Sequence, residues 1–590
     1  MFALSTILIA GGVAYSGSIV YKRMRMRHHP LRWPRRDRQI QRFMYTREEP
    51  VTHDRTLERA NRTLTLSSLS LGVTVVGVLM KPVLMLVSVP TALVIFAPSF
   101  QAAWQALRRE RRIAPPALDA TRVMLCIILG YYVALALDTW LRTLAQRLFL
   151  RAEAEFQYTL DQHFVESPSA VWCFTGGAEV HTPITDLAVG DIVSVTTGEL
   201  IPADGVILYG FAWVDERLTN GHGQVVRKAT GDAVSASTLV QNGQIYLQIT
   251  ATGKLLGTTA VRKRLEAMVQ SGSHLAEAGK RSGEAMALPM WVASAVLLPF
   301  WDPNRAAGFL TTSFGNQMER LGPYALQNFA TVALQQNLLI YDGRALEALN
   351  LVNTIVMEAN LFTDPDLREQ ALDAIAALRR RRWPMQEITS QRFAVFLLAD
   401  GNEAETKALA GDLGVDDYFV APLIEERAEL LKRLQAGGRF ICYVGSGAES
   451  ATVTEQALVT LAIPSATNGA MPVDAVEQIA STPAHVVLIE KDVKRLVQLF
   501  DIAARFGVSE GFSIAWPLFM DLVDISTTVF IHFGLTYSIL FSYSGLLGSA
   551  LYVRLPLVRY QRDADPKPTQ PVDPERQIAD SSHPYEYRYE

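Results

Sequence analysis

The chain has 590 residues, of which 49% are apolar and 19% are charged, and its formal net charge is -4. This length allows several compact units, and the apolar residues gather in blocks. The blocks exclude a disordered chain and an ordinary soluble enzyme with one core, and the net charge gives no indication of nucleic-acid binding. Cys126, Cys173 and Cys442 are far apart and form no CxxC pair, so we expect neither a disulfide framework nor a cysteine zinc site.

The N-terminus combines an uncharged apolar segment with a basic one. Residues 3–21 carry no charge, and a dense run of arginines with one lysine follows directly. A secretory signal has its positive charge before the apolar run, so the reversed order predicts a retained membrane anchor over residues 1–21. Residues 22–63 then form a basic cytoplasmic segment, and we expect its first part, residues 22–47, to face anionic lipids.

Further apolar stretches predict helical hairpins in a membrane. Residues 66–103 are too long for one span and are broken at Lys81-Pro82. Residues 118–150 fit a tighter pair that turns near Gly130-Tyr131. The two hairpins together occupy residues 64–150.

Two more hairpins are predicted within residues 284–340 and 506–556, which brings the total to about nine spans. The parity of the spans places the soluble segments and the C-terminal tail in the cytoplasm, as expected of a multi-pass protein of the bacterial plasma membrane. The tail, residues 557–590, is rich in proline, charge and tyrosine, which predicts disorder. It is either a docking peptide for a partner or a plain solvated end.

Two soluble segments lie between the hairpins. Residues 151–283 contain short β-like runs separated by glycine, aspartate and proline, which predicts a small β-rich domain. Residues 341–505 alternate β-like and helical runs, the pattern of a parallel sheet with helices on its faces. The fold class is therefore a polytopic α-helical membrane protein with one β-rich and one α/β (Rossmannoid) domain.

This order of segments resembles that of the P-type ATPases. Two stretches support the resemblance, the first being similar to the heavy-metal-transporting branch and the second to the later half of the phosphorylation domain. The stretch LAVGDIVSVTTGELIPADGVILYGFAWVDERLTNG is similar to the actuator domain, and LLADGNEAETKALAGDLGVDDYFVAPLIEERAELLKRLQAGGRFICYVGSG is similar to the HAD-type phosphorylation domain. The resemblance covers residues 64–556. It implies an actuator-like domain over residues 151–283 and a HAD-like phosphorylation domain over residues 341–505.

The family phosphorylates the aspartate of a DKTGT motif, and the matching stretch here reads EANLF, beginning at Glu358. A glutamate places its carboxylate one methylene further out, and in-line attack tolerates little misplacement. Ala359 and Asn360 replace the lysine and the hydroxyl that help to neutralise phosphate charge.

Other positions that the resemblance makes catalytic also differ. The GDGxND motif, which supplies magnesium ligands, reads GSGAES. Ser446 and Ser450 replace its two aspartates, and Glu449, which replaces the asparagine, is the one carboxylate that could partly compensate. The TGD motif is replaced by a sequence that contains Asp400, and the phosphate-contacting lysine by Arg427.

The dephosphorylation loop and the nucleotide-binding domain of the family also have no close counterpart in this sequence. The TGE loop of the actuator domain is matched by NGH, in which His222 is more plausible as a solvated loop residue than as a general base. Residues 359–392 stand where the family has its nucleotide-binding domain, and they are too few to form a domain with a core. No GxxxxGK[ST] or GxGxxG motif replaces it, so we expect no nucleotide and no cofactor.

The family's CPC-type metal motif corresponds to Phe314-Gly315-Asn316, which has no thiol. Intramembrane carboxylates are the remaining candidates for a cation or proton site, because ionisable groups in hydrocarbon face the bundle interior. They are Glu319, Asp521 and Asp524, with Gln317, Arg320 and His532 nearby in sequence. The alternative for these groups is internal salt bridging and helix adhesion, for example between Arg320 and an aspartate.

Three functions fit these observations. The first is a pseudo-ATPase that keeps the scaffold, has lost phosphorylation, and acts as a scaffold, regulator or assembly partner linked to metal or cation handling. The second is an ATP-independent channel or carrier that uses the intramembrane carboxylates. The third is an active heavy-metal exporter with aberrant motifs. For the first we expect a protein partner in the same membrane and no nucleic acid.

Overall fold

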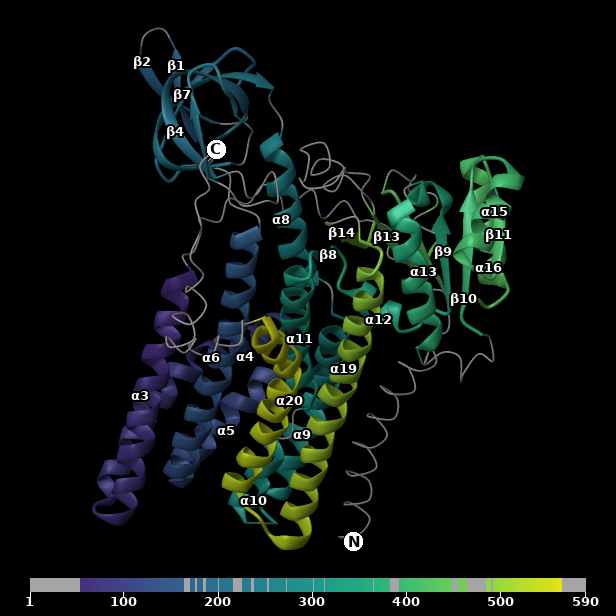
Figure 1. Ribbon diagram of the computed structural model, residues 1–590. Coiled ribbons are helices and arrows are strands. Elements are labelled where there is room, and N and C mark those ends of the chain that lie inside the picture. The colour runs from purple at the N-terminus through teal and green to yellow at the C-terminus, as the bar shows by residue number, and fades with distance from the viewer. Residues whose placement is uncertain are drawn as a thin grey trace, which may run out of the picture.

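The computed structural model of the chain describes residues 53–564 except for the following segments: 164–169, 176–177, 184–186, 200, 216–224, 235–237, 252–253, 272, 301, 312–313, 364, 382–391, 448–452, 454–455, 464–483 and 490–491. The predicted anchor, residues 22–52 of the predicted basic segment and residues 565–590 of the predicted tail lie outside the described residues. Residues 53–63 and 557–564 are helical, so the prediction of disorder is wrong for the start of the tail. Figure 1 shows a helical bundle that carries a β domain and a separate α/β domain at the same end.

The bundle contains the helices predicted from the apolar blocks. Their bounds are α3 (His53–Leu79), η1 (Pro82–Val87), α4 (Ser88–Gln105), η2 (Ala106–Glu110), α5 (Pro115–Leu129), α6 (Tyr132–His163), α9 (His274–Leu297), α10 (Pro303–Gly308), η4 (Phe309–Thr311), α11 (Phe314–Gln335), α19 (Arg495–Ser526), η6 (Thr527–Ile531) and α20 (Leu535–Ala564). The first hairpin turns at Lys81-Pro82, as predicted. Gly130 ends α5 in the left-handed conformation with a φ of 76°, which confirms the predicted turn there.

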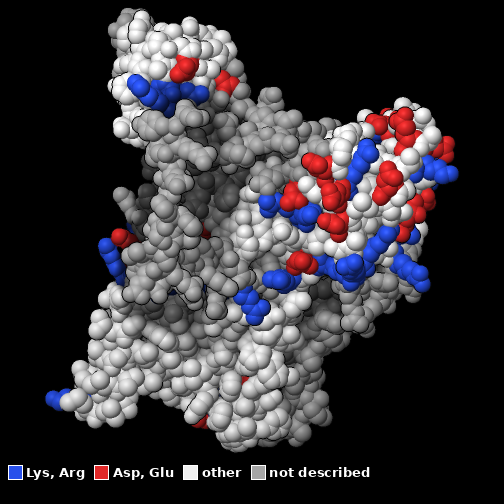
Figure 2. Space-filling model, viewed as in Figure 1, with Lys and Arg blue, Asp and Glu red and all other residues white. Residues whose placement is uncertain are grey.

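Three helical segments of the described chain are long and apolar enough to cross a membrane: Thr56–Leu79, Pro82–Glu110 and Arg495–Ile531. The sequence predicted about nine spans, so this count is lower. The other helices are present but fall short in length or in apolar content, because α5 has only 15 residues and α6, α9 and α11 carry charged side chains. In Figure 2 the bundle is nearly free of charge on the face shown, whereas the α/β domain is densely charged. An uncharged outer surface of this kind is what a bilayer requires.

Close packing between α9 and α11 depends on glycine. A Cβ atom at Gly315 would lie 2.5 Å from the backbone nitrogen of Gly283 and 2.8 Å from the carbonyl oxygen of Gly279. A Cβ at Gly279 would meet the backbone nitrogen of Glu319 at 2.5 Å. The backbones therefore approach as in other small-residue helix pairs of membrane proteins.

We expect Gly315→Ala to lower the stability of the protein by about 1–3 kcal/mol, because the added methyl group meets backbone atoms that cannot move independently. Thermal unfolding in detergent measures this effect. Gly511→Ala on α19 is the matched control, since no atom lies within 4 Å of its added Cβ. Equal melting temperatures for the two variants would contradict the role of glycine at this contact.

The β domain is a seven-stranded sheet that follows the predicted β-like runs. Its strands are β1 (Ala170–Thr175), β2 (Ala178–Pro183), β3 (Ile192–Thr196), β4 (Asp204–Asp215), β5 (Val225–Ala229), β6 (Ala233–Val234) and β7 (Leu239–Ala251). The order is β2-β1-β3-β7-β4-β5, with β6 paired to β4, and all pairs are antiparallel. Helices α6 and α8 (Lys254–Ser271) connect it to the rest of the chain.

The α/β domain contains the predicted parallel sheet. Its elements are β8 (Leu338–Ile340), α12 (Arg344–Leu349), β9 (Thr354–Glu358), η5 (Ala359–Phe362), α13 (Pro365–Arg380), β10 (Ala394–Ala399), α15 (Glu403–Leu413), β11 (Asp417–Val420), α16 (Ile424–Ala436), β12 (Ile441–Gly445), β13 (Val459–Ala462) and β14 (Val486–Leu488). The strand order is β11-β10-β9-β12-β13-β14-β8, with only β8 antiparallel. Strand β8 precedes the predicted start of this domain at residue 341, and α19 begins before its predicted end at residue 505.

Helix α12 joins the sheet to α19 of the bundle. The side-chain amide of Asn350, directly after α12, donates to the carbonyl oxygen of Ala503 at 2.8 Å. Glu347 accepts a 3.3 Å hydrogen bond from the backbone nitrogen of His274, and its carboxyl group is hydrogen-bonded to that of Glu510. Burial of this pair raises the pKa of Glu347 to about 7.

The raised pKa of Glu347 predicts that the stability of the protein falls as the pH rises from about 4.5 to about 7. In that range the unfolded chain loses the proton of Glu347, whereas the folded chain retains it because the carboxyl group is buried against Glu510. Neighbouring Arg344 and Asp342 act on Glu347 with opposite signs, and His274 lies 3.9 Å away. Glu347→Gln should flatten the dependence of melting temperature on pH. Glu277→Gln, an exposed carboxylate on α9, is the control that should keep the wild-type slope.

Candidate functional site

The sheet brings three of the predicted site residues to one edge. Glu358 ends β9, Asp400 directly follows β10, and Ser446 directly follows β12. Both neighbouring strands run parallel to β9, so their carboxyl ends meet at this edge. The chain crosses from one side of β9 to the other here, and ligands of open α/β sheets bind at such switch points.

The carboxylate of Glu358 is held by two partners at this edge. Arg427, on α16, contacts its Oε1 with Nη1 at 2.9 Å, and the Tyr443 hydroxyl donates to the same oxygen at 2.6 Å. The Glu358 and Arg427 side chains are only 6% and 14% exposed. Arg427 is fixed in turn, because its Nε donates to the carbonyl oxygen of Ala421 at 3.0 Å.

Asp400 lies on the other side of the same guanidinium. Its Oδ2 is 3.5 Å from Arg427 Nη2 and accepts a 3.1 Å hydrogen bond from Asn360. The hydrogen bond from Asn360, more than the charge of Arg427, lowers the pKa of Asp400. Asn360 and Arg427 thus keep Asp400 ionised, and Arg427 stands between two carboxylates.

This arrangement does not fit a magnesium ion. Magnesium requires oxygen ligands in near-octahedral geometry, and the two carboxylates that could supply them are bound to the same guanidinium. A second cation in that space would be repelled by Arg427. No group of three His, Cys, Asp or Glu side chains in the described chain could hold a metal ion.

The other predicted residues of the reaction cycle fall outside the described parts of the chain. These residues are His222, Glu449 and Ser450. The interval between β9 and β10 contains η5 and α13 in its described part, which agrees with the predicted helix. Sequence reasoning did not identify Tyr443, because a tyrosine in a buried strand looks like a core residue until its hydroxyl is seen to reach Glu358.

The structure does not bring the three intramembrane carboxylates into one cluster. Asp521 and Asp524 are both buried on α19, at 0% and 2% exposure, and Asp524 accepts a hydrogen bond from Thr311 at 3.1 Å. Glu319 lies where α11 packs against Gly279 of α9. His532 is exposed and has a φ of 67° after the π-helical turn η6, so it does not continue the helix face of the two aspartates.

The predicted intramembrane salt bridging occurs, but between other residues than expected. Arg122 contacts Asp138 at 3.0 Å and Asp119 at 2.9 Å, and Arg142 contacts Asp119 at 2.9 Å. Arg320 makes no ion pair with any residue that the structure describes, so the expected pairing of Arg320 with an aspartate is wrong. The spacing of Asp119 and Arg122 by three residues in an apolar segment was the available sequence signal.

Comparison with known proteins identifies the β domain. A sequence model of the P-type ATPase actuator domain matches residues 166–270. These residues lie within the predicted actuator segment and include all of the β sheet. The chain is therefore a P-type ATPase-like protein with an actuator domain, and its apolar helices make it a membrane protein.

Curated relatives point to the heavy-metal ATPases. The chain is 32% identical over 123 residues to copper-transporting ATPase 1 of Rhizobium meliloti, covering 21% of this chain and 15% of the relative. It is 40% identical over 77 residues to a probable copper-exporting P-type ATPase of Archaeoglobus fulgidus, covering 13% and 10%. It is 26% identical over 217 residues to probable copper-exporting P-type ATPase V of Mycobacterium tuberculosis, covering 35% and 28%. The matches thus span less than a third of each relative's length.

Among solved structures, a zinc-transporting PIB-type ATPase in the E2.Pi state aligns with 85% of this chain and 100% of its own. The TM-score is 0.43 and the sequence identity is 16%.

We expect Arg427→Met to destabilise the protein by about 2–4 kcal/mol, because it leaves the buried Glu358 carboxylate without its counter-charge while Tyr443 still donates a hydrogen bond. The matched control is Arg379→Met, which breaks an Arg–Asp pair in the same domain whose side chains are each 40% exposed. That pair should contribute about 0–1 kcal/mol. Adding Glu358→Gln to Arg427→Met should restore part of the loss. Similar thermal unfolding of the two single variants would contradict the importance of the buried pair.

Proposed function

We propose that this protein is a catalytically inactive P-type ATPase-like membrane protein that acts by binding, as a scaffold, regulator or assembly partner in metal or cation handling. The observation that carries the proposal is the ion pair between Glu358 and Arg427 at the position of the family's phosphorylated aspartate. A phosphate acceptor must offer a free carboxylate oxygen, and the oxygen Oε1 of Glu358 already accepts from Arg427 and Tyr443.

The chemistry of the neighbouring groups supports the same proposal. The HAD-like sheet edge lacks the aspartates of the family's magnesium motif, and its remaining carboxylates share one arginine. The chain between β9 and β10 offers α13 and a short segment where the family inserts a nucleotide-binding domain. We therefore expect neither ATP binding nor a phosphoenzyme, and we assign the protein to the pseudoenzymes.

A binding role requires a partner and a defined location of the protein in the cell. We propose that the protein spans the bacterial plasma membrane with both soluble domains in the cytoplasm, and that a protein partner in the same membrane binds it. The basic residues 22–47 would hold the cytoplasmic face against anionic lipids. The relatives' copper transport suggests that the partner handles a metal ion.

The direct test uses the purified full-length protein in lipid nanodiscs and ATP radiolabelled at the γ-phosphate, with copper or zinc ions present. We expect no acid-stable phosphoenzyme in the wild type and the same result for Glu358→Gln. A copper-transporting P-type ATPase prepared in parallel is the positive control. Labelling of the wild type that is lost in Glu358→Gln would show an active acyl-phosphate cycle and refute the proposal.

Co-purification from mild detergent tests the binding role itself. A membrane protein recovered with the wild type should also be recovered with Glu358→Gln, because binding does not require phosphorylation. Deletion of residues 563–590 separates docking by the tail from docking by the domains. Recovery of the chain alone from its native membrane, under conditions that preserve known complexes, would argue against a scaffold.

A further inference from the structure

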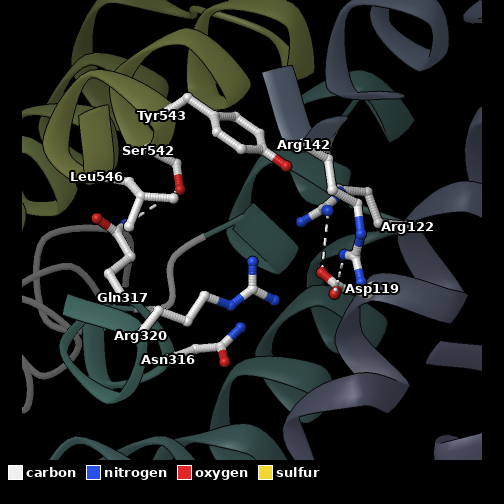
Figure 3. Close-up of a pocket in the computed structure, with 9 residues that line it drawn as sticks. All are labelled: Asp119, Arg122, Arg142, Asn316, Gln317, Arg320, Ser542, Tyr543 and Leu546. Carbon is white, nitrogen blue, oxygen red and sulfur yellow. Dashed lines mark hydrogen bonds and ion pairs between the residues drawn. The ribbon is translucent and has the colours of Figure 1, made fainter. Parts of the chain in front are cut away.

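A polar cavity lies inside the helical bundle, where α5, α6, α11 and α20 meet (Figure 3). Its volume is about 40 Å³, and it shares Asp119, Arg142, Asn316 and Arg320 with an adjoining cavity of about 210 Å³. The wider cavity reaches Pro98 and Ala102, which are exposed on the outer surface of α4. The two cavities together lead from the bundle surface to a group of arginines.

Two of the three arginines at this cavity are already paired. Arg122 is bound to Asp119 and Asp138, and Arg142 is bound to Asp119 and to the Ser99 hydroxyl at 2.9 Å. Arg142 also lies 4.4 Å from the ring centre of Phe96. Neither guanidinium has to find a further counter-ion.

Arg320 differs from both. In Figure 3 its guanidinium extends into the space between Asn316 and Asp119. Arg320 has no hydrogen bond or ion pair with the described residues. Asp119 is nevertheless close enough for an electrostatic attraction between the two side chains. Three guanidinium groups thus face two carboxylates, and the excess positive charge belongs to Arg320.

The other polar groups that line the smaller cavity are amides and hydroxyls. They are the amides of Asn316 and Gln317 and the hydroxyls of Ser542 and Tyr543. Both hydroxyls are engaged within the protein, because Ser542 donates to the carbonyl oxygen of Thr311 at 3.3 Å and Tyr543 is hydrogen-bonded to Asp138. The Gln317 amide donates to Ser542 at 3.2 Å, while its buried Oε1 has no partner. Rotation of this amide would let it accept from Ser542 and direct its N–H groups to the unpaired side.

We propose that this cavity binds a monoanionic phosphate group, with Arg320 as its principal ligand. An uncompensated guanidinium inside a bundle is costly, and one negative charge neutralises it. Guanidinium binds phosphate oxygens in a bidentate manner, and the side-chain amide of Asn316 offers a donor to a further oxygen. The phosphate group belongs either to the headgroup of a lipid that enters beside Pro98 and Ala102, or to inorganic phosphate. This proposal does not depend on whether the protein hydrolyses ATP.

The test has one arm for each source, and both use the delipidated full-length protein in neutral detergent. The first arm measures binding of radiolabelled inorganic phosphate by equilibrium dialysis. The second arm titrates phosphatidylglycerol, and diacylglycerol as the phosphate-free comparison, and counts bound lipids by native mass spectrometry. We expect saturable binding in one of the two arms, and no corresponding site for diacylglycerol.

Variants of the cavity decide whether the binding is at Arg320. Arg320→Gln should weaken it about tenfold or more, as expected for loss of a charge-assisted pair, whereas Arg320→Lys should retain part of it. Asn316→Asp supplies an internal counter-charge to Arg320 and should displace the phosphate. Arg62→Gln, an exposed arginine on α3, is the matched control.

The proposal is overturned if neither arm shows saturable binding, which would mean that water alone solvates Arg320. It is also overturned if Arg320→Gln and Asn316→Asp bind as the wild type does. Because Asn316→Asp adds a partner instead of removing one, its result remains interpretable if Arg320→Gln fails to fold.

Discussion

The ion pair of Glu358 with Arg427 determines how the central edge of the α/β sheet can be used. A buried carboxylate at the end of β9 requires a counter-charge, and this chain supplies it from α16. An ATPase of this architecture leaves the position open for a magnesium ion and a phosphoryl group, which arrive and depart during the cycle. A guanidinium attached to the chain cannot depart, so the same electrostatic requirement is met permanently by Arg427.

At the cavity in the membrane bundle the arginines outnumber the carboxylates that they contact. There Arg122 and Arg142 neutralise Asp119 and Asp138, and Arg320 remains in excess. The part of the bundle where α5, α6 and α11 meet therefore carries an excess of positive charge, whereas Asp521 and Asp524 are buried elsewhere in the bundle, on α19. The two sites share one feature: arginine side chains fixed to the chain are placed beside buried carboxylates.

The sequence predicted most of the architecture and only part of the sites. Short apolar runs such as Ala394–Ala399 could be assigned to buried parallel strands, because they alternate with amphipathic helical runs along the chain. Glu358, Asp400 and Arg427 were placed by resemblance, but their mutual distances depend on strand register and on the position of α16. The spacing of Asp119 and Arg122 could have indicated their pairing. The contacts of Arg122 with Asp138 and of Arg142 with Asp119 depend on how α5 packs against α6, which no local sequence pattern encodes.

The packing of the cores shows which parts of the molecule can move independently. One continuous core runs from the sheet, at Ile355 and Met357, through α12 to Phe329 of α11 and Phe506 of α19. Packed interiors of this kind resist continuous deformation, so the α/β domain and the neighbouring bundle helices behave as one body. The actuator domain has its own separate core and is joined through α6 and α8. Because its core is separate, the actuator domain can change position without repacking the larger core, whereas the α/β domain cannot move relative to α11 and α19 unless that core is repacked.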